Sequence, residues 1–157
     1  MKQAKKIITR MLLNNWGGIS HRMMEFHEYV NLFSGKSGSG KSTVMDAIQV
    51  VLYGSMSASF LNKAADDAKN RRSVMSYLRG EQKDGTANRG GQDFGSTLVL
   101  EIKDTGNGIT TCFGVLFEIG RADTDINGKY TFFSHSGSMP EDEYLEEGGI
   151  PYSRGRM

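Results

Sequence analysis

The sequence has very little cysteine and proline and almost no excess of either charge. Among its 157 residues there are one cysteine and two prolines. The single Cys112 excludes an internal disulfide framework and is typical of a protein in a reducing cytosol. Lys and Arg total 19 against 18 Asp and Glu, which gives a net charge of +1. This balance argues against a polybasic tail that binds nucleic acid by charge alone.

Long hydrophobic runs are also missing from the sequence. The longest mostly apolar stretch, residues 44–53, contains Asp46 and Gln49, whereas a membrane span needs ~20 apolar residues. The first residues are basic, but no apolar segment of the signal-peptide kind follows them. We therefore expect a soluble cytoplasmic protein with no membrane partner.

Glycine, by contrast, is abundant at 20 residues, while apolar residues make up only 38%. The length suits one domain, and the modest apolar content predicts a large surface that is exposed or covered by a partner. So many glycines indicate tight turns and at least one site lined by backbone.

The hydrophobic pattern predicts an α/β fold. A helix is expected over 42–53, ending at Gly54, with so many apolar positions that it should be buried on more than one side. A second helix is expected over 71–79 and a loop over 80–95. Alternation and turn signals predict strands over 7–13, 19–26, 29–34, 96–104, 110–119 and 129–135. The last three form an antiparallel meander, and residues 136–157 are an acidic tail without an apolar pattern.

One segment fits the phosphate-binding P-loop pattern G-x-x-x-x-G-K-[ST]. Its glycines let backbone N–H groups converge on phosphates, and the helix that follows directs its positive dipole end at the same anion. Lys41 would bind the β- and γ-phosphates, the Ser42 hydroxyl would bind Mg²⁺, and Thr43 would support the α-phosphate. The segment consists of Gly35, Lys36, Ser37, Gly38, Ser39, Gly40, Lys41 and Ser42.

The surroundings of this segment distinguish between classes of P-loop protein. Small kinases open with the P-loop strand and continue into parallel βα units, but here 34 residues precede the loop and an antiparallel meander follows the helix. That layout resembles the N-terminal half of an SMC-type ABC ATPase head. Residues 29–54, 62–65 and 76–81, with Leu98–Glu101 and Phe113–Phe117, are similar to the JetC, MukB-related family of the Wadjet anti-plasmid system.

The resemblance implies an α/β P-loop NTPase of the ABC/SMC head type, with a mixed sheet around the helix and an antiparallel β lobe. Residues 1–135 would form this half-head and 136–157 a tail that continues into further sequence. The other half would carry the signature motif, the Walker B aspartate and the catalytic glutamate. Implied cofactors and partners are ATP, Mg²⁺, the C-terminal half, a second head, DNA and condensin-like accessory subunits.

The resemblance also suggests further site residues, each with a simpler alternative. Trp16 lies where such heads approach the base or ribose, or else it is a core residue in a turn. Lys63 lies near the expected phosphate position, or else it is a solvated lysine. Gln49 is better explained by packing than by nucleotide contact. A small basic cluster could contact DNA phosphates, or it is a solvated face; its members are Lys69, Arg71, Arg72 and Arg79.

Several weaker patterns have structural explanations. Glu101 and Glu118 each end an apolar run, as a Walker B acid would, but both fit alternating strands. Gly90-Gly91-Gln92 resembles the end of a signature motif without its Leu-Ser. The three histidines show no metal-ligand spacing, and Cys112 lies in an apolar strand pattern, as a core residue would.

These observations predict an ATP-binding part of an SMC-like ATPase, with Lys41 as the catalytic lysine, that turns ATP over very slowly by itself. Phosphoryl transfer to water needs a positioned nucleophile, and the sequence offers no clear source of one. A small P-loop kinase that phosphorylates a small molecule is the alternative enzyme. A non-enzymatic nucleotide-binding fragment is the third possibility.

Overall fold

The computed structural model describes residues 3–27, 41–54, 56, 73–82 and 84–156. Within these ranges the largest element is a five-stranded sheet with the order β2-β1-β3-β4-β5, and every pairing is antiparallel. Its strands are β1 (Lys6–Trp16), β2 (Ile19–Glu25), β3 (Phe94–Asp104), β4 (Thr110–Ile119) and β5 (Tyr130–Ser136). The expected strand over 29–34 lies outside the described residues. Because every pairing within the described ranges is antiparallel, these ranges do not contain the expected mixed sheet.

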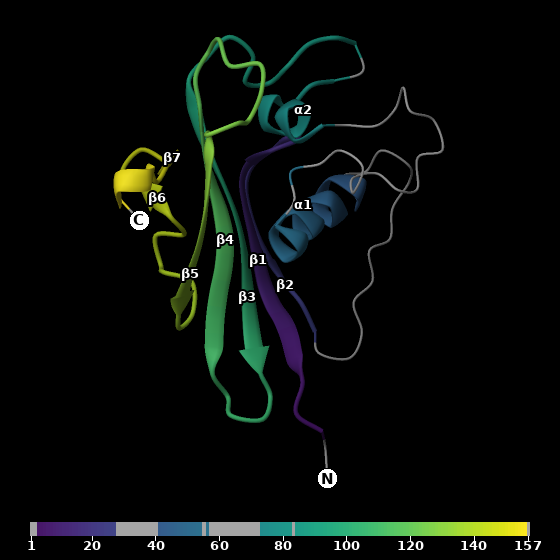
Figure 1. Cartoon of the computed structure of the whole chain (residues 1–157), viewed down its shortest axis with the longest axis vertical. Helices are drawn as coiled ribbons and strands as arrows, with labels where there is room; N and C mark the ends of the chain where they lie inside the picture. Colours follow the sequence, from purple (N-terminus) through teal and green to yellow (C-terminus); the bar gives the residue numbers. More distant parts are fainter. Residues whose placement is uncertain (1–2, 28–40, 55, 57–72, 83, 157) are drawn as a thin grey trace.

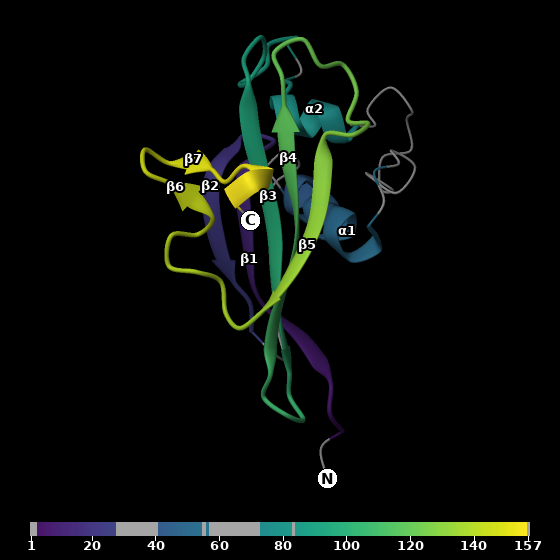
Figure 2. The same ribbon diagram turned by 60° about the vertical axis from the view of Figure 1, so that its left-hand side comes forward.

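Two helices cover one face of the sheet (Figure 1). They are α1 (Lys41–Tyr53) and α2 (Val74–Arg79), and the short strands β6 (Leu145–Glu146) and β7 (Ile150–Pro151) lie against the other face (Figure 2). A 3₁₀ helix, η3, spans Arg154–Arg156. None of the helices in the described segments combines the length and apolarity that a membrane crossing requires.

Successive side chains of a strand point to opposite faces of the sheet. In the central strands the side chains on both faces are buried. Leu98 and Leu100 of β3 join the cluster beneath α1 and α2, whereas Val99 between them joins the cluster on the far face. In β4, Val115 and Phe117 likewise face the helices and Cys112 faces away. Cys112 is fully buried, which confirms its assignment to the core.

Helix α1 is less enclosed than the sequence pattern predicts. Val44, Ala47 and Val50 are buried against the sheet, but Met45 and Leu52 are 40% and 53% exposed. The expectation of burial on more than one side therefore holds only in part: Asp46 is buried against Tyr77 of α2, but the side that carries Met45 and Leu52 is exposed.

The segment after residue 135 is not the unpatterned tail that the sequence suggested. Met139 and Tyr144 are buried with Leu12, Val99 and Cys112 in the cluster on the far face. His135 and the hydroxyl of Tyr144 are 2.5 Å apart, and Asn14 donates to the Glu143 carbonyl at 3.2 Å. The expected boundary at 135/136 therefore does not correspond to a break in packing.

Gly114 provides a test of how tightly the far face is packed. A Cβ at this β4 position would lie 2.6 Å from Cζ of Phe133 and 2.8 Å from the Leu98 carbonyl oxygen. We predict that Gly114→Ala lowers the free energy of unfolding by about 2 kcal/mol, as measured by denaturant unfolding. Gly18→Ala is the control, since a Cβ there meets nothing within 4 Å. Equal stability of the two variants would contradict this packing.

Candidate nucleotide-binding site

The P-loop motif leads directly into α1, whose first residue is Lys41. Ser42 and Thr43 therefore occupy the first turn, where backbone N–H groups without intrahelical partners favour an anion. Ser42 is exposed and Thr43 is half-buried. Gly35, Lys36, Ser37, Gly38, Ser39 and Gly40 lie outside the described residues, as does the predicted phosphate-binding residue Lys63.

Trp16 contacts this end of α1 from the sheet side. Its Nε1–H donates a hydrogen bond of 2.9 Å to the carbonyl of Thr43, and its ring stacks on Tyr77 with centroids 4.7 Å apart. The side chain is fully buried. The contact with a nucleotide base or ribose stays a prediction, whereas the full burial of Trp16 favours its alternative, a core residue in a turn, which here supports the helix that follows the P-loop.

A second support of α1 was not predicted from the sequence. The Tyr77 hydroxyl donates a hydrogen bond to Oδ2 of Asp46, and both side chains are buried. The signal that could have revealed it was Asp46 itself, an acidic residue inside a stretch that otherwise packs against the sheet. Gln49, on the same helix, is half-buried and is consistent with packing.

The basic cluster is only partly described, and its described member is not at the surface. Lys69, Arg71 and Arg72 lie outside the described residues. Arg79 is only 7% exposed, which favours a structural role over the predicted contact with DNA. Its guanidinium donates to the backbone carbonyls of Arg89, Gln92, Gly120, Arg121 and Asp123. These bonds join the end of α2 to the loops that flank β3 and β4.

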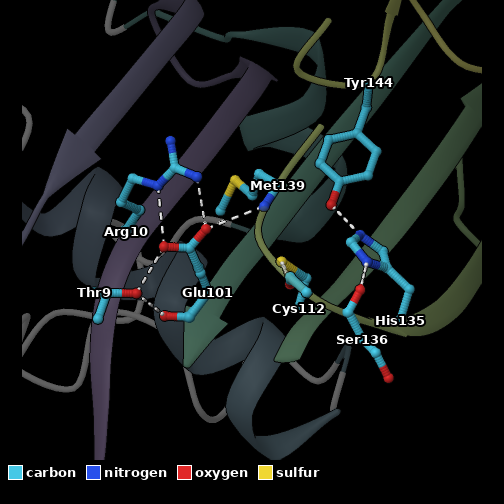
Figure 3. Close-up of polar contacts among 9 residues, drawn as sticks. Thr9, Arg10, Glu101, Cys112, His135, Ser136, Met139 and Tyr144 are labelled. Carbon is cyan, nitrogen blue, oxygen red and sulfur yellow. Dashed lines mark hydrogen bonds and ion pairs between the residues drawn. The ribbon is translucent and has the colours of Figure 1, made fainter. Parts of the chain in front are cut away.

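Glu101 is held in a structural cluster rather than at a catalytic position (Figure 3). It accepts hydrogen bonds from Nε of Arg10 at 3.0 Å, from Nη2 of Arg10 at 2.6 Å and from the Met139 amide at 3.0 Å. Thr9 donates to the same carboxylate at 2.8 Å. Burial by itself would raise the pKa of Glu101, but these hydrogen bonds and the charge of Arg10 lower it to about 2.

The other weak patterns have equally local roles. Glu118 is exposed on β4 and accepts a hydrogen bond from the amide of Arg154. Gln92, which ends the signature-like triplet, donates to the Asn88 carbonyl in a turn, and strand β3 follows rather than a helix. In the described part of the chain, no three His, Cys, Asp or Glu side chains gather as a metal-binding group.

Comparisons with known proteins agree with the P-loop assignment. Residues 8–68 match the family model described as the P-loop containing region of AAA domain. The chain is also 37% identical over 74 residues to SbcC, a component of the nuclease SbcCD, from Staphylococcus haemolyticus. The aligned part is 45% of this chain but 6% of that protein, so the chain spans a small fraction of the relative's length.

The matches and the α/β structure together support a P-loop NTPase fold and a nucleotide-binding region similar to part of SbcC. Such a region implies the use of a nucleotide and Mg²⁺. The structure adds the arrangement of side chains that contact the N-terminal end of α1. Trp16 and Tyr77 connect the start of α1 to β1 and α2.

The Glu101 cluster predicts a specific acid sensitivity. Because the folded-state pKa of about 2 lies below the ordinary glutamate value of 4.5, the ionised carboxylate stabilises the fold above pH 4.5. That contribution is lost as the pH falls through the folded-state pKa of about 2. We predict that Glu101→Gln is less stable than wild type at neutral pH. Between pH 4.5 and about pH 2 its free energy of unfolding should fall by less than that of wild type, as measured by denaturant unfolding.

The control for this prediction is Glu118→Gln, which changes an exposed glutamate on the neighbouring strand and keeps the Arg10 contact intact. It should follow the wild-type pH profile. If the free energy of unfolding of Glu101→Gln falls with decreasing pH as steeply as that of wild type, this carboxylate does not cause the loss of stability in acid.

Proposed function

We propose that the chain is the ATP-binding N-terminal portion of an SMC-like ATPase head. The observation that carries the proposal is a P-loop sequence that enters α1 directly, with α1 packed on a sheet whose described strands all pair in antiparallel fashion. A kinase-like order would instead place this helix in a series of parallel βα units. The likeness to part of SbcC supports the same interpretation.

In this proposal the ligand is ATP with Mg²⁺. Residues 35–40 surround the phosphates with backbone N–H groups, and Lys41 binds the β- and γ-phosphate oxygens. Ser42 binds the metal ion and Thr43 supports the α-phosphate. Lys63 is retained as an additional phosphate contact, whereas Trp16 is assigned to supporting the helix.

The outer side of α1 is proposed as the surface that receives the C-terminal half of the head. Met45, Leu52 and Tyr53 are 40%, 53% and 68% exposed there, although a P-loop helix of this apolarity favours burial. Contiguous exposed apolar surface marks interaction sites. The C-terminal half would supply the Walker B and signature motifs, and a second head would complete the ATP site.

The finer assignment is to the Wadjet JetC, MukB-related class, with a role in anti-plasmid defence in the cytoplasm. Its support is the set of sequence similarities over 29–54, 62–65 and 76–81. In this setting ATP hydrolysis would drive motion on DNA with condensin-like accessory subunits. Lys69, Arg71 and Arg72 remain the proposed DNA contacts.

The first test is titration with Mg·ATP. We predict that the wild-type chain binds Mg·ATP and that Lys41→Ala weakens binding at least ~10-fold, because it removes a charge-assisted phosphate contact worth about 1.5–3 kcal/mol. Calorimetric titration measures the affinity, and turnover is followed in the same samples. Lys103→Ala, a change at an exposed lysine of β3, is the matched control and should bind as wild type.

The outcomes separate the candidate functions. Binding with negligible turnover that rises when the C-terminal half is added supports the proposal. Multiple turnovers or phosphate transfer to a small molecule by the isolated chain would favour a kinase. Binding without any response to the C-terminal half would favour a nucleotide-binding fragment with no enzymatic role.

The DNA proposal has its own test. We predict that the triple variant Lys69→Ala, Arg71→Ala, Arg72→Ala weakens duplex DNA binding and lowers the magnitude of the salt slope by up to about 3, close to 0.9 per lost phosphate contact. Fluorescence anisotropy at several salt concentrations measures both. Arg79→Met should instead lower the melting temperature, because its carbonyl contacts are internal. An unchanged salt slope in the triple variant would contradict the assignment.

A further inference from the structure

We infer that Tyr77 and Asp46 are positioning residues of the nucleotide site: their buried hydrogen bond sets the orientation of the first turns of α1 and thereby the affinity for the phosphates. This inference rests on the proposed function, since it concerns the same ATP site. Neither residue belongs to the P-loop sequence, and both act through the helix.

Asp46 is an unusual residue for its location. It lies on the second turn of α1, four residues after Ser42, and it is only 3% exposed on a helix whose Val44, Ala47 and Val50 belong to the apolar core. Burying a carboxylate among apolar side chains is costly unless hydrogen bonds compensate. The Tyr77 hydroxyl supplies one such bond from α2, a separate element 31 residues further along the chain.

Tyr77 itself is held firmly. Its ring stacks on Trp16 with an interplanar angle of 14°. Its carbonyl accepts hydrogen bonds from the amide of Gly17 at 2.7 Å and from the Arg89 guanidinium at 3.2 Å. Helix α2 is capped at both ends, by the Ser73 hydroxyl and by Gly80 in the left-handed region. The donor that meets Asp46 is therefore fixed in place by side-chain and backbone contacts.

The end of β1 and the turn that follows it contact α1 at two further points. Trp16 donates to the Thr43 carbonyl at 2.9 Å. Gly17, with φ of 59°, approaches so closely that a Cβ there would lie 2.7 Å from Cγ2 of Thr43. Contacts to Thr43 and to Asp46, three residues apart, restrain both the axial position and the rotation of the helix. These restraints fix the direction of the N–H groups that receive phosphate.

A site that is preorganised in this way binds more tightly, because less conformational freedom is lost when the ligand arrives. Removing the hydroxyl of Tyr77 while keeping its ring should therefore weaken phosphate binding without removing any group that touches ATP. A purely structural bond would lower stability and leave the affinity of the folded molecules unchanged.

The test compares Tyr77→Phe with wild type in Mg·ATP titrations, well below the melting temperature of each protein. Tyr77→Phe should bind about 5- to 10-fold more weakly. Tyr130→Phe is the matched control, since this tyrosine is exposed on β5, and it should bind as wild type. Trp16 is the only tryptophan, so its emission spectrum without nucleotide reports whether the stack on Tyr77 is intact.

A second pair of variants keeps the inference testable if Tyr77→Phe does not fold. Asp46→Asn retains an acceptor for the tyrosine hydroxyl and should bind Mg·ATP within about 2-fold of wild type, whereas Asp46→Leu should lose about 5- to 10-fold. Wild-type affinity in Tyr77→Phe or in Asp46→Leu, with only a lower melting temperature, would overturn the inference. Absence of Mg·ATP binding by the wild type, or its persistence in Lys41→Ala, would instead overturn the proposed function.

Discussion

The structure depends on one constraint: β3 and β4 are buried on both faces, so the sheet must be covered on both sides. Leu98 and Leu100 face the helices while Val99 faces the opposite cluster, and a strand that is apolar on both faces is stable only when both layers are present. The helices provide one layer and the segment around Met139 and Tyr144 provides the other. The Glu101 carboxylate links the sheet to that second layer, because it binds Arg10 and the Met139 amide together.

The candidate site is a product of the same arrangement. Helix α1 is placed by its apolar side on β1 and β3, but apolar packing alone does not determine how a helix is rotated or shifted along its axis. Directional contacts supply that information here, from Trp16 to the Thr43 carbonyl and from Tyr77 to Asp46. Phosphate recognition by backbone N–H groups needs this precision because the donors cannot move independently of the helix.

Much of this architecture could be predicted from the sequence because its signals are local. Alternation and Gly- or Asn-rich turns predicted β3, β4 and β5 closely, and the P-loop pattern predicted where α1 begins. What could not be predicted depends on contacts between distant segments. Examples are the exposure of Leu52, the burial of Arg79 and the packing of Tyr144. Each depends on which elements of the fold pack against that residue, and the residue type alone does not indicate this.

Strand β5 has a practical meaning for work with the protein. It is an edge, paired with β4 alone among the described strands, and its Tyr130 and Phe132 are 38% and 41% exposed. An open edge with aromatic side chains is a template on which a further chain can add. In the part of the chain that the structure describes, β5 is therefore a strand on which edge-to-edge association of purified molecules could begin.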